Sequence, residues 1–482
     1  MIIVILVLFL LSTRVSVAID PPSITILSPI EQSKLYFNDD TGFRDVEITP
    51  WALENKKLGG NYLYLVSSYN THICDDDNNI LLTDVYTKIS NCKLRQSSAN
   101  TPSNTTLADG TKSLWSRDYY GAFSGHIIGT KNQGFQIYTI NHGELLNNNY
   151  FSALPERCKI APDIGYGLYP CTVENHTLSY NAFVGMSSFA WNTNNFYSDN
   201  NFIDQGPIVW PGNGYVDKIK KATVLGILHP TSIIKDGYIY VFFRDTSQGN
   251  EAGRMSGMKV ARAPITDSGI DPISFKTYFQ TDFIDSALPL GFDKEKIEDY
   301  FSQKGGRSSG LFNADNRTDY IPDVYSFSVA HLMGTNWYLG VAQDLYLGVT
   351  LRLSMDLVNW SQQIVVPGTE FNYFKDGGTP EFIKQPFMYP RLASIDGDSN
   401  NEIDPNNFFI IGTSDGKNPF NSQYKAKIVN KINLKLNLVK SGDYDNDQKV
   451  DLVDFGLWKV EYLTGRSSLV EFGVWKTAYL TK

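Results

Sequence analysis

The segment that most constrains this chain is Leu228–Asp245, with the sequence LHPTSIIKDGYIYVFFRD. Apolar and aromatic residues flank a Lys-Asp-Gly turn, and Gly237 can supply the positive φ that a short hairpin needs. Similar units, which turn at Gly, Asn or Asp and return on aromatic residues, recur at 59–70, 125–143, 328–344 and 389–416. Repeated β-meanders of this kind predict the blades of a β-propeller around a central channel.

Length and composition agree with an all-β protein. The 482 residues exceed one ordinary core, so we expect a large domain and an accessory piece. The chain holds 28 Tyr, 28 Phe and 8 Trp, residue types that favour strands. A net charge of −9 argues against a nucleic-acid partner, because phosphate binding needs a basic face, and it is compatible with sugar substrates.

The N-terminus has the pattern of a secretory signal peptide. Residues 2–11 are apolar, and Ser16-Val17-Ala18 supplies small residues for cleavage after Ala18. The apolar run is too short to span a bilayer comfortably. Because neither Lys nor Arg precedes it, an uncleaved anchor is the alternative. We therefore expect residues 1–18 to be removed and the mature protein to be secreted, extracellular or at the cell surface, without a membrane-spanning segment.

The sequence contains four cysteines, an even number, at positions 74, 92, 158 and 171. In a secreted chain this predicts disulfides, with three alternative pairings. Proximity favours Cys74–Cys92 and Cys158–Cys171, which would stabilise long loops between blades and would have no chemical role. Four free thiols are the alternative.

A calcium-binding loop is expected near the C-terminus, in the sequence GDYDNDQKVDLVDF at 442–455. Its oxygen donors have the spacing of positions 1, 3, 5, 7, 9 and 12 of a calcium loop. The expected ligands are Asp443, Asp445, Asp447, the Lys449 carbonyl, Asp451 and Asp454. Gln448 replaces the usual glycine at position 6, and Asp454 replaces the usual glutamate at position 12. An acidic surface turn is the alternative.

This C-terminal segment resembles the type I dockerin module, in which an aspartate at the twelfth position is usual. The helical half is repeated at 450–463 and 467–480, whereas the second loop is reduced to 464–468, so we expect one calcium site. The resemblance implies that residues 431–482 form a small α-helical module. It also implies a cohesin-like scaffold protein as a partner, to which such modules tether carbohydrate-active enzymes.

A second resemblance lies in the body of the chain. The segments LRLSMDLVNWSQ at 351–362, HPTSIIKDGYIYVFF at 229–243 and ARAPITDSG at 261–269 are similar to blade segments of glycoside hydrolase family 43 and its relatives. The resemblance implies a five-bladed propeller, with six blades as an alternative, over residues 19–430. Within the first segment, we expect Trp360 to pack between blades and Asp356 to cap a turn.

In that family, three carboxylates at the starts of inner strands hydrolyse glycosidic bonds. Inversion needs the acid and base about 6.5–9.5 Å apart. Here the expected aspartate before proline is replaced by His229, and the counterparts of His229 are His126, His331 and Tyr389-Pro390-Arg391. The family's acids therefore do not carry over position by position.

Other residues remain as candidates for the site. The candidate catalytic acids are Asp118, Asp163, Asp323 and Glu381. The candidate sugar-binding residues are His126, His229, Arg244 and Arg391. Each acid has a turn-capping or solvated role as its alternative, and each histidine a role in the core.

Three functions follow from these patterns. The favoured one is a secreted glycoside hydrolase, or a lyase, that degrades a polysaccharide and carries a calcium-bound tail. The alternatives are a propeller that binds glycan without cleaving it and a structural or adhesive surface protein.

Overall fold

The computed structural model describes a subset of the chain, with two- or three-residue gaps inside some ranges. The longer described ranges are 24–37, 51–76, 92–97, 119–146, 180–191, 202–211, 224–245, 258–293, 300–312, 324–370, 388–394, 401–417, 425–438 and 450–463. The chain divides into two compact units, one of residues 28–435 and one of residues 1–27 with 436–482.

The larger unit consists of antiparallel β-meanders that follow one another along the chain. The first contains β2 (Trp51–Leu58), β3 (Asn61–Ser67), β4 (Asn70–Asp76) and β5 (Cys92–Ser97). The second contains β7 (Tyr119–Thr130), β8 (Gly134–Leu146), β11 (Tyr180–Trp191) and β12 (Ile203–Val209). The third contains β13 (Val224–Lys235), β14 (Tyr238–Asp245), β15 (Met258–Thr266), β17 (Lys276–Phe279) and β18 (Asp282–Ser286).

Two further meanders complete the series. The fourth contains β19 (Val324–Leu332), β20 (Tyr338–Asp344), β21 (Gly348–Ser354) and β22 (Ile364–Val365). In the fifth, β23 (Met388–Ser394), β25 (Phe408–Lys417) and β26 (Lys425–Leu438) are joined by β1 (Ile24–Phe37). Short elements are β6 (Thr106–Leu107), β9 (Thr172–Val173), β10 (His176–Thr177), β16 (Gly269–Ile270), the 3-10 helix η2 (Pro272–Ser274) and β24 (Glu402–Ile403).

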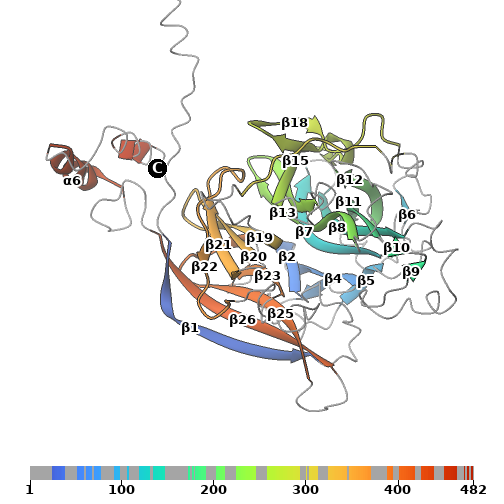
Figure 1. Cartoon of the computed structure of the whole chain (residues 1–482), viewed down its shortest axis with the longest axis horizontal. Coiled ribbons are helices and arrows are strands. Elements are labelled where there is room, and N and C mark those ends of the chain that lie inside the picture. The colour runs from blue at the N-terminus through green and yellow to red at the C-terminus, as the bar shows by residue number, and fades with distance from the viewer. Residues whose placement is uncertain are drawn as a thin grey trace, which may run out of the picture. The chain divides into compact units, whose positions relative to one another are not determined.

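The first strands of the five meanders form the inside of the propeller. β7 lies against β2 and β13, and β19 lies against β13 and β23. The meanders fan out from these strands, and β1, from the start of the chain, pairs with β26 from its end (Figure 1). The fold is therefore an all-β propeller, as predicted, and its described strands form five blades, a number that the sequence left open between five and six.

The blades pack through apolar strands that are covered on both faces. All residues of β20 and β21 are buried, as are all but the first residue of β14. Such strands are rich in apolar residues because neither face meets water, and the polar side chains among them, such as Arg352, are buried as well. One core cluster joins residues of the second and third blades, and another joins the third and fourth blades. Burial between blades explains why the aromatic hairpins of the sequence repeat.

The segment 351–362 forms the predicted structural turn. The Trp360 ring packs on Phe242 of the third blade, with ring centroids 6.1 Å apart, and on Phe327 of the fourth at 5.1 Å. The Asp356 carboxylate accepts hydrogen bonds from the backbone N–H groups of Val358 and Asn359, at 3.0 and 2.7 Å. Both roles predicted for this motif, a tryptophan between blades and an aspartate cap, are confirmed.

The described part of the smaller unit contains helix α6 (Leu452–Leu463). Its start is fixed by two aspartates, because the Asp451 side chain accepts from the Val453 N–H and the Asp454 side chain accepts from the Asp451 N–H. The indole N–H of Trp475 donates to the Asp451 carbonyl at 2.8 Å. Aromatic rings of the two sequence repeats pack together, with Phe455 and Trp475 centroids 4.8 Å apart.

Several sequence predictions lie outside the described residues, among them the signal peptide at 1–18 and the cysteines at 158 and 171. The backbone register of β4 and β5 places Cys74 opposite Cys92, a spacing that a disulfide can bridge, and the disulfide itself stays a prediction. Among the described helices, none has the length and apolar character needed to cross a membrane.

Candidate functional site

Every blade's inner strand has an irregularity near its start. In each case the pairing with the second strand shifts in register, which marks a β-bulge. The shifts fall at Ala52/Glu54, Ala122/Ser124, Leu228/Thr231, Val324/Ser326 and Met388/Arg391. Bulges bend a strand and re-aim its side chains, and they are frequent beside active sites. Their repetition around the ring makes the centre of the propeller the candidate site.

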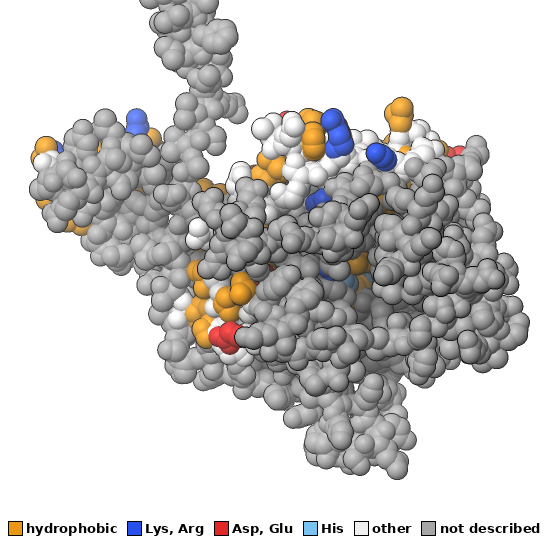
Figure 2. Space-filling model, viewed as in Figure 1, with side chains coloured by type: hydrophobic (Ala, Val, Ile, Leu, Met, Phe, Trp, Pro, Cys, Tyr) orange, Lys and Arg blue, Asp and Glu red, His pale blue; other side chains and the backbone are white. Residues whose placement is uncertain are grey.

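A pocket lies at this place, where four inner strands converge. Its lining residues are Phe123 of β7, His229 and Pro230 of β13, Ser326 and Phe327 of β19, and Tyr389, Pro390 and Arg391 of β23. The empty space between these walls is about 220 Å³, including the part open to solvent. The space-filling view shows basic and histidine side chains beside hydrophobic ones in a hollow of this unit (Figure 2).

Two of the bulges share an unusual backbone. His229 has φ 50° and Tyr389 has φ 51°, and each precedes a proline. A left-handed conformation is uncommon for residues other than glycine, and a following proline restricts the backbone further. Strained residues of this kind persist where the surroundings hold them, often at functional sites. The bulges of the third and fifth blades therefore hold two aromatic side chains in place at a local energetic cost.

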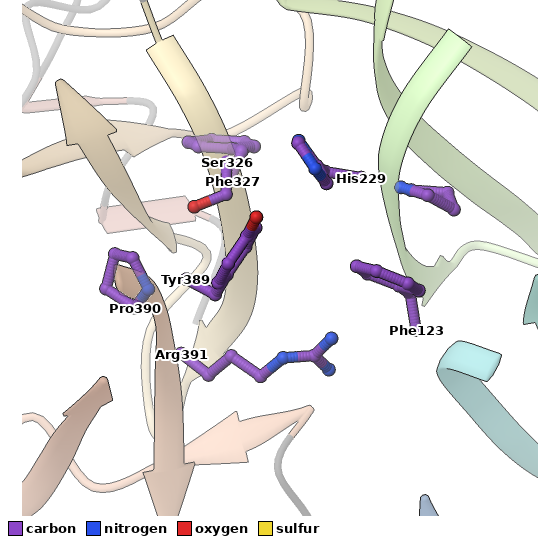
Figure 3. Close-up of a pocket in the computed structure, with 8 residues that line it drawn as sticks. Phe123, His229, Ser326, Phe327, Tyr389, Pro390 and Arg391 are labelled. Atoms are coloured by element: carbon purple, nitrogen blue, oxygen red, sulfur yellow. The ribbon is translucent and has the colours of Figure 1, made fainter. Parts of the chain in front are cut away.

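The pocket's side chains converge from different blades. The His229 and Tyr389 rings meet edge to face, with centroids 5.1 Å apart, and the His229 and Phe123 centroids are 6.0 Å apart. The guanidinium carbon of Arg391 lies 6.0 Å from the centre of the Phe123 ring. Figure 3 shows Tyr389 and Arg391 extending from one side toward His229 and Phe123 on the other. Aromatic faces combined with an imidazole, a phenol and a guanidinium suit a polar ligand that also has apolar ring surface, such as a sugar.

His142, on the second strand of the second blade, supports this group from behind. Its ring centroid lies 6.0 Å from that of His229 and 5.6 Å from that of Phe123, and its side chain is buried. His142 thus packs against both rings and helps to fix the position of His229.

A second polar cluster, buried in the inner strands, surrounds His126. The imidazole Nε2 lies 2.8 Å from the Ser232 hydroxyl, which lies 2.7 Å from the Ser124 hydroxyl. On its other side, Nδ1 lies 3.3 Å from the Asn401 amide nitrogen. Burial lowers the pKa of His126 from 6.5 to about 4, because the charged imidazolium would lose its water. His126 is therefore neutral at physiological pH.

The segment around β24 links several blades beside this cluster. The Asn401 carbonyl accepts from the His331 N–H at 2.7 Å, and the Ile403 carbonyl accepts from the Met333 N–H at 2.9 Å. β24 also pairs in parallel with β19. The connection between β23 and β25 therefore contacts the fourth blade through its backbone and the second blade through the contact of Asn401 with His126.

The structure brings together two of the predicted sugar-binding residues and separates the other two from the pocket. His229 and Arg391 line it. His126 lies fully buried in the cluster just described, and Arg244 is buried within β14, so neither is among the pocket's lining residues. The candidate acids Asp118, Asp163, Asp323 and Glu381 lie outside the described residues.

Sequence reasoning did not select Phe123, Ser326 or Phe327, and it treated Tyr389 only as a counterpart of His229. The available signal was the recurrence of an aromatic residue before proline at two blade starts. Phe123 and Ser326 had no such signal in the sequence, because only the packed inner strands show which of their residues line the pocket.

The predicted calcium loop is described only at its end. Asp443, Asp445, Asp447 and Lys449 lie outside the described residues, whereas Asp451 and Asp454 stand at the start of α6. The Asp454 side chain is buried. Within the described ranges, no group of three or more His, Cys, Asp or Glu side chains is arranged to hold a metal ion. The calcium site accordingly stays a prediction.

Comparisons with known proteins place glycoside hydrolases among the structural neighbours. No family model and no curated protein matches the sequence. Among solved structures, Zg3597, a family 117 glycoside hydrolase of Zobellia galactanivorans, has a TM-score of 0.40 at 10% identity, covering 85% of this chain and 91% of that one. The catalytic domain of a Coprinopsis cinerea GH62 α-L-arabinofuranosidase has a TM-score of 0.37 at 10% identity, covering 85% and 97%.

A thermostable family 43 glycoside hydrolase has a TM-score of 0.35 at 9% identity, covering 81% of this chain and 93% of that one. These are likenesses of low score and low identity. The five-bladed fold described above is established by the strand pairing and by the contacts among the inner strands.

Proposed function

We propose that this protein is a secreted, carbohydrate-active propeller that binds a polysaccharide in its central pocket and hydrolyses O-glycosidic bonds there. The observation that carries the proposal is the convergence of four inner-strand bulges on one pocket with aromatic, imidazole and guanidinium groups. Sugar rings pack their C–H faces on aromatic side chains and hydrogen-bond through their hydroxyls, so this lining suits them.

Hydrolysis would require a general acid and a general base at the pocket. The candidates are the four carboxylates selected from sequence, Asp118, Asp163, Asp323 and Glu381. Two of them immediately precede inner strands in the chain, since Asp118 comes before β7 and Asp323 before β19. This position in sequence supports their candidacy.

The smaller unit is proposed to bind one calcium ion through the 443–454 loop and to attach the propeller to a cohesin-like scaffold protein. The support is the ligand spacing in the sequence, together with the aspartates that begin α6. Calcium would supply structural stability, because its ligands lie on a loop that must be ordered for the helix to pack.

The test is sugar release from a panel of plant and microbial polysaccharides. Each candidate acid is changed to its amide, as in D118N, D163N, D323N and E381Q. We expect at least one acid and one base to emerge, each lowering the rate by about 100-fold or more. D236N is a matched control, because Asp236 is exposed at the tip of the β13–β14 turn and asparagine tolerates its positive φ. Saturable glycan binding without product release would instead establish a non-catalytic glycan-binding propeller.

A further inference from the structure

We propose that the unit held in the central pocket is a uronate, and that the pocket cleaves its 4-O-linkage by β-elimination with His229 as base, Tyr389 as acid and Arg391 as carboxylate clamp. This inference rests on the proposed binding of polysaccharide in the same pocket. It specifies the substrate class as an acidic polysaccharide, and it offers elimination by the described residues as the alternative to hydrolysis by the four candidate carboxylates.

The three groups enter one pocket from two strands. Arg391 follows Tyr389 by two residues on β23, and both side chains enter the pocket together (Figure 3). Facing them, His229 comes from β13, with its ring centroid 5.1 Å from that of Tyr389. The two rings are in edge-to-face contact, so a sugar in the pocket would meet the imidazole, the phenol and the guanidinium together on one side.

Burial distinguishes the three roles. The exposed fraction is 3% for His229 and 3% for Tyr389, whereas Arg391 is half-buried. Arg391 is thus more exposed than the other two residues, and an entering carboxylate would meet it first. Its five N–H donors can hold a carboxylate in a bidentate pair while keeping other contacts. The neutralised carboxylate would then make the proton at the adjacent carbon easier to remove.

Two of the three residues also share a strained backbone. His229 and Tyr389 share a left-handed backbone before proline, in two non-adjacent blades. Both residues line the same pocket, where a base and an acid acting on one sugar would have to lie.

The reaction balances without a cofactor. The imidazole of His229 takes the C5 proton of the uronate, and the electron pair of that C–H bond forms the C4=C5 double bond. The C4–O bond breaks, and the departing sugar oxygen takes the phenolic proton of Tyr389. Transfer of the proton from the imidazolium to the phenolate restores both groups. General acid–base catalysis of this kind contributes about 10²–10⁴-fold to a rate, and histidine and tyrosine are both suited to it.

The test uses the full chain with polygalacturonate and alginate, each beside its carboxyl-reduced counterpart. Two readouts run together, namely reducing ends and the ultraviolet absorbance of the unsaturated uronate. We expect equal amounts of both products from at least one acidic polymer and none from its reduced form. Y389F and H229N should lower the rate by about 100-fold or more, and R391K should mainly raise KM.

These variants are matched to the local structure and to controls. Y389F removes only a hydroxyl, and asparagine tolerates the left-handed backbone at 229. Y338F and H331N alter the same residue types on β20 and β19 outside the pocket's lining, and both should retain the wild-type rate. Retained activity in Y389F and H229N would overturn the assignment.

The outcomes also separate this inference from the proposed function. Reducing ends without the unsaturated product would refute elimination and leave a hydrolase. Equal cleavage of the acidic and carboxyl-reduced polymers would refute the uronate. No cleavage of any polymer would refute both proposals of catalysis.

Discussion

Acid should destabilise the propeller through His126, and the size of the effect follows from its burial. The pKa of His126 falls from 6.5 to about 4 on folding, and each pKa unit corresponds to about 1.36 kcal/mol. The native state therefore loses about 3 kcal/mol, relative to the unfolded chain, once the pH has fallen to about 4.

The sign is fixed by which state binds the proton. Between pH 6.5 and about 4 the unfolded chain protonates this histidine and the folded chain does not, so stability is complete above pH 6.5 and declines as the pH falls. The variant H126Q lacks this titration. At pH 7 it should be less stable than the wild type, because the Ser232 hydroxyl and the Asn401 amide lose their present partner.

The assay is denaturant unfolding of both proteins, followed by tryptophan fluorescence, at intervals from pH 7 to pH 4. As the pH falls from 7 to 4, the unfolding free energy of the wild type should decrease by about 3 kcal/mol relative to that of H126Q. Titration of carboxylates distant from this site cancels in the difference. A difference that stays constant with pH would show that His126 is not desolvated in the native state.

Three other changes test the packing, the turn and the tail. G340A would place a Cβ 2.4 Å from the Phe327 ring and should cost about 1–3 kcal/mol of stability in thermal or denaturant unfolding, whereas G310A, which meets nothing within 4 Å, should be neutral. D356A removes the cap of the 354–360 turn and should cost about 1 kcal/mol by the same measurement, with D356N largely restoring it. In differential scanning calorimetry of the full chain, removal of calcium by a chelator should lower the melting temperature of the transition that belongs to the tail. D445N should abolish this dependence on calcium.

Contradicting results for these changes are equally direct. Equal stability of G340A and G310A would mean that the aromatic cluster around Trp360 is loosely packed. A loss in D356N as large as that in D356A would show that charge, rather than the hydrogen-bond acceptor, caps the turn. A melting profile that does not change with calcium would refute the calcium site proposed for the tail.

The fold was predictable from sequence where local chemistry and the final structure agree. The hairpin at 228–245 forms β13 and β14 around Gly237, which has φ 76°, because the turn residues and the apolar strands are specified by neighbours in the chain. The roles of Trp360 and Asp356 were also predictable, since a turn is satisfied by hydrogen bonds within a few residues.

Other features depended on residues far apart in sequence. His126 and Arg244 were plausible sugar-binding residues from their places in the hairpins, yet burial between strands removes both from the pocket lining. The partners of His126, at 232 and 401, come from two other blades. A pattern along one strand carries no information about which side chain from another blade will face it.

The sequence by itself determined the all-β class, the repeated hairpins and the turn before Trp360, because these follow from alternation, turn residues and local hydrogen bonds. Only the tertiary structure decided the number of blades, the pairing of β1 with β26 and the membership of the central pocket. The reason is geometric. Packing of the blades brings the inner strands β7, β13, β19 and β23 together, and only then do Phe123, His229, Tyr389 and Arg391 line one pocket.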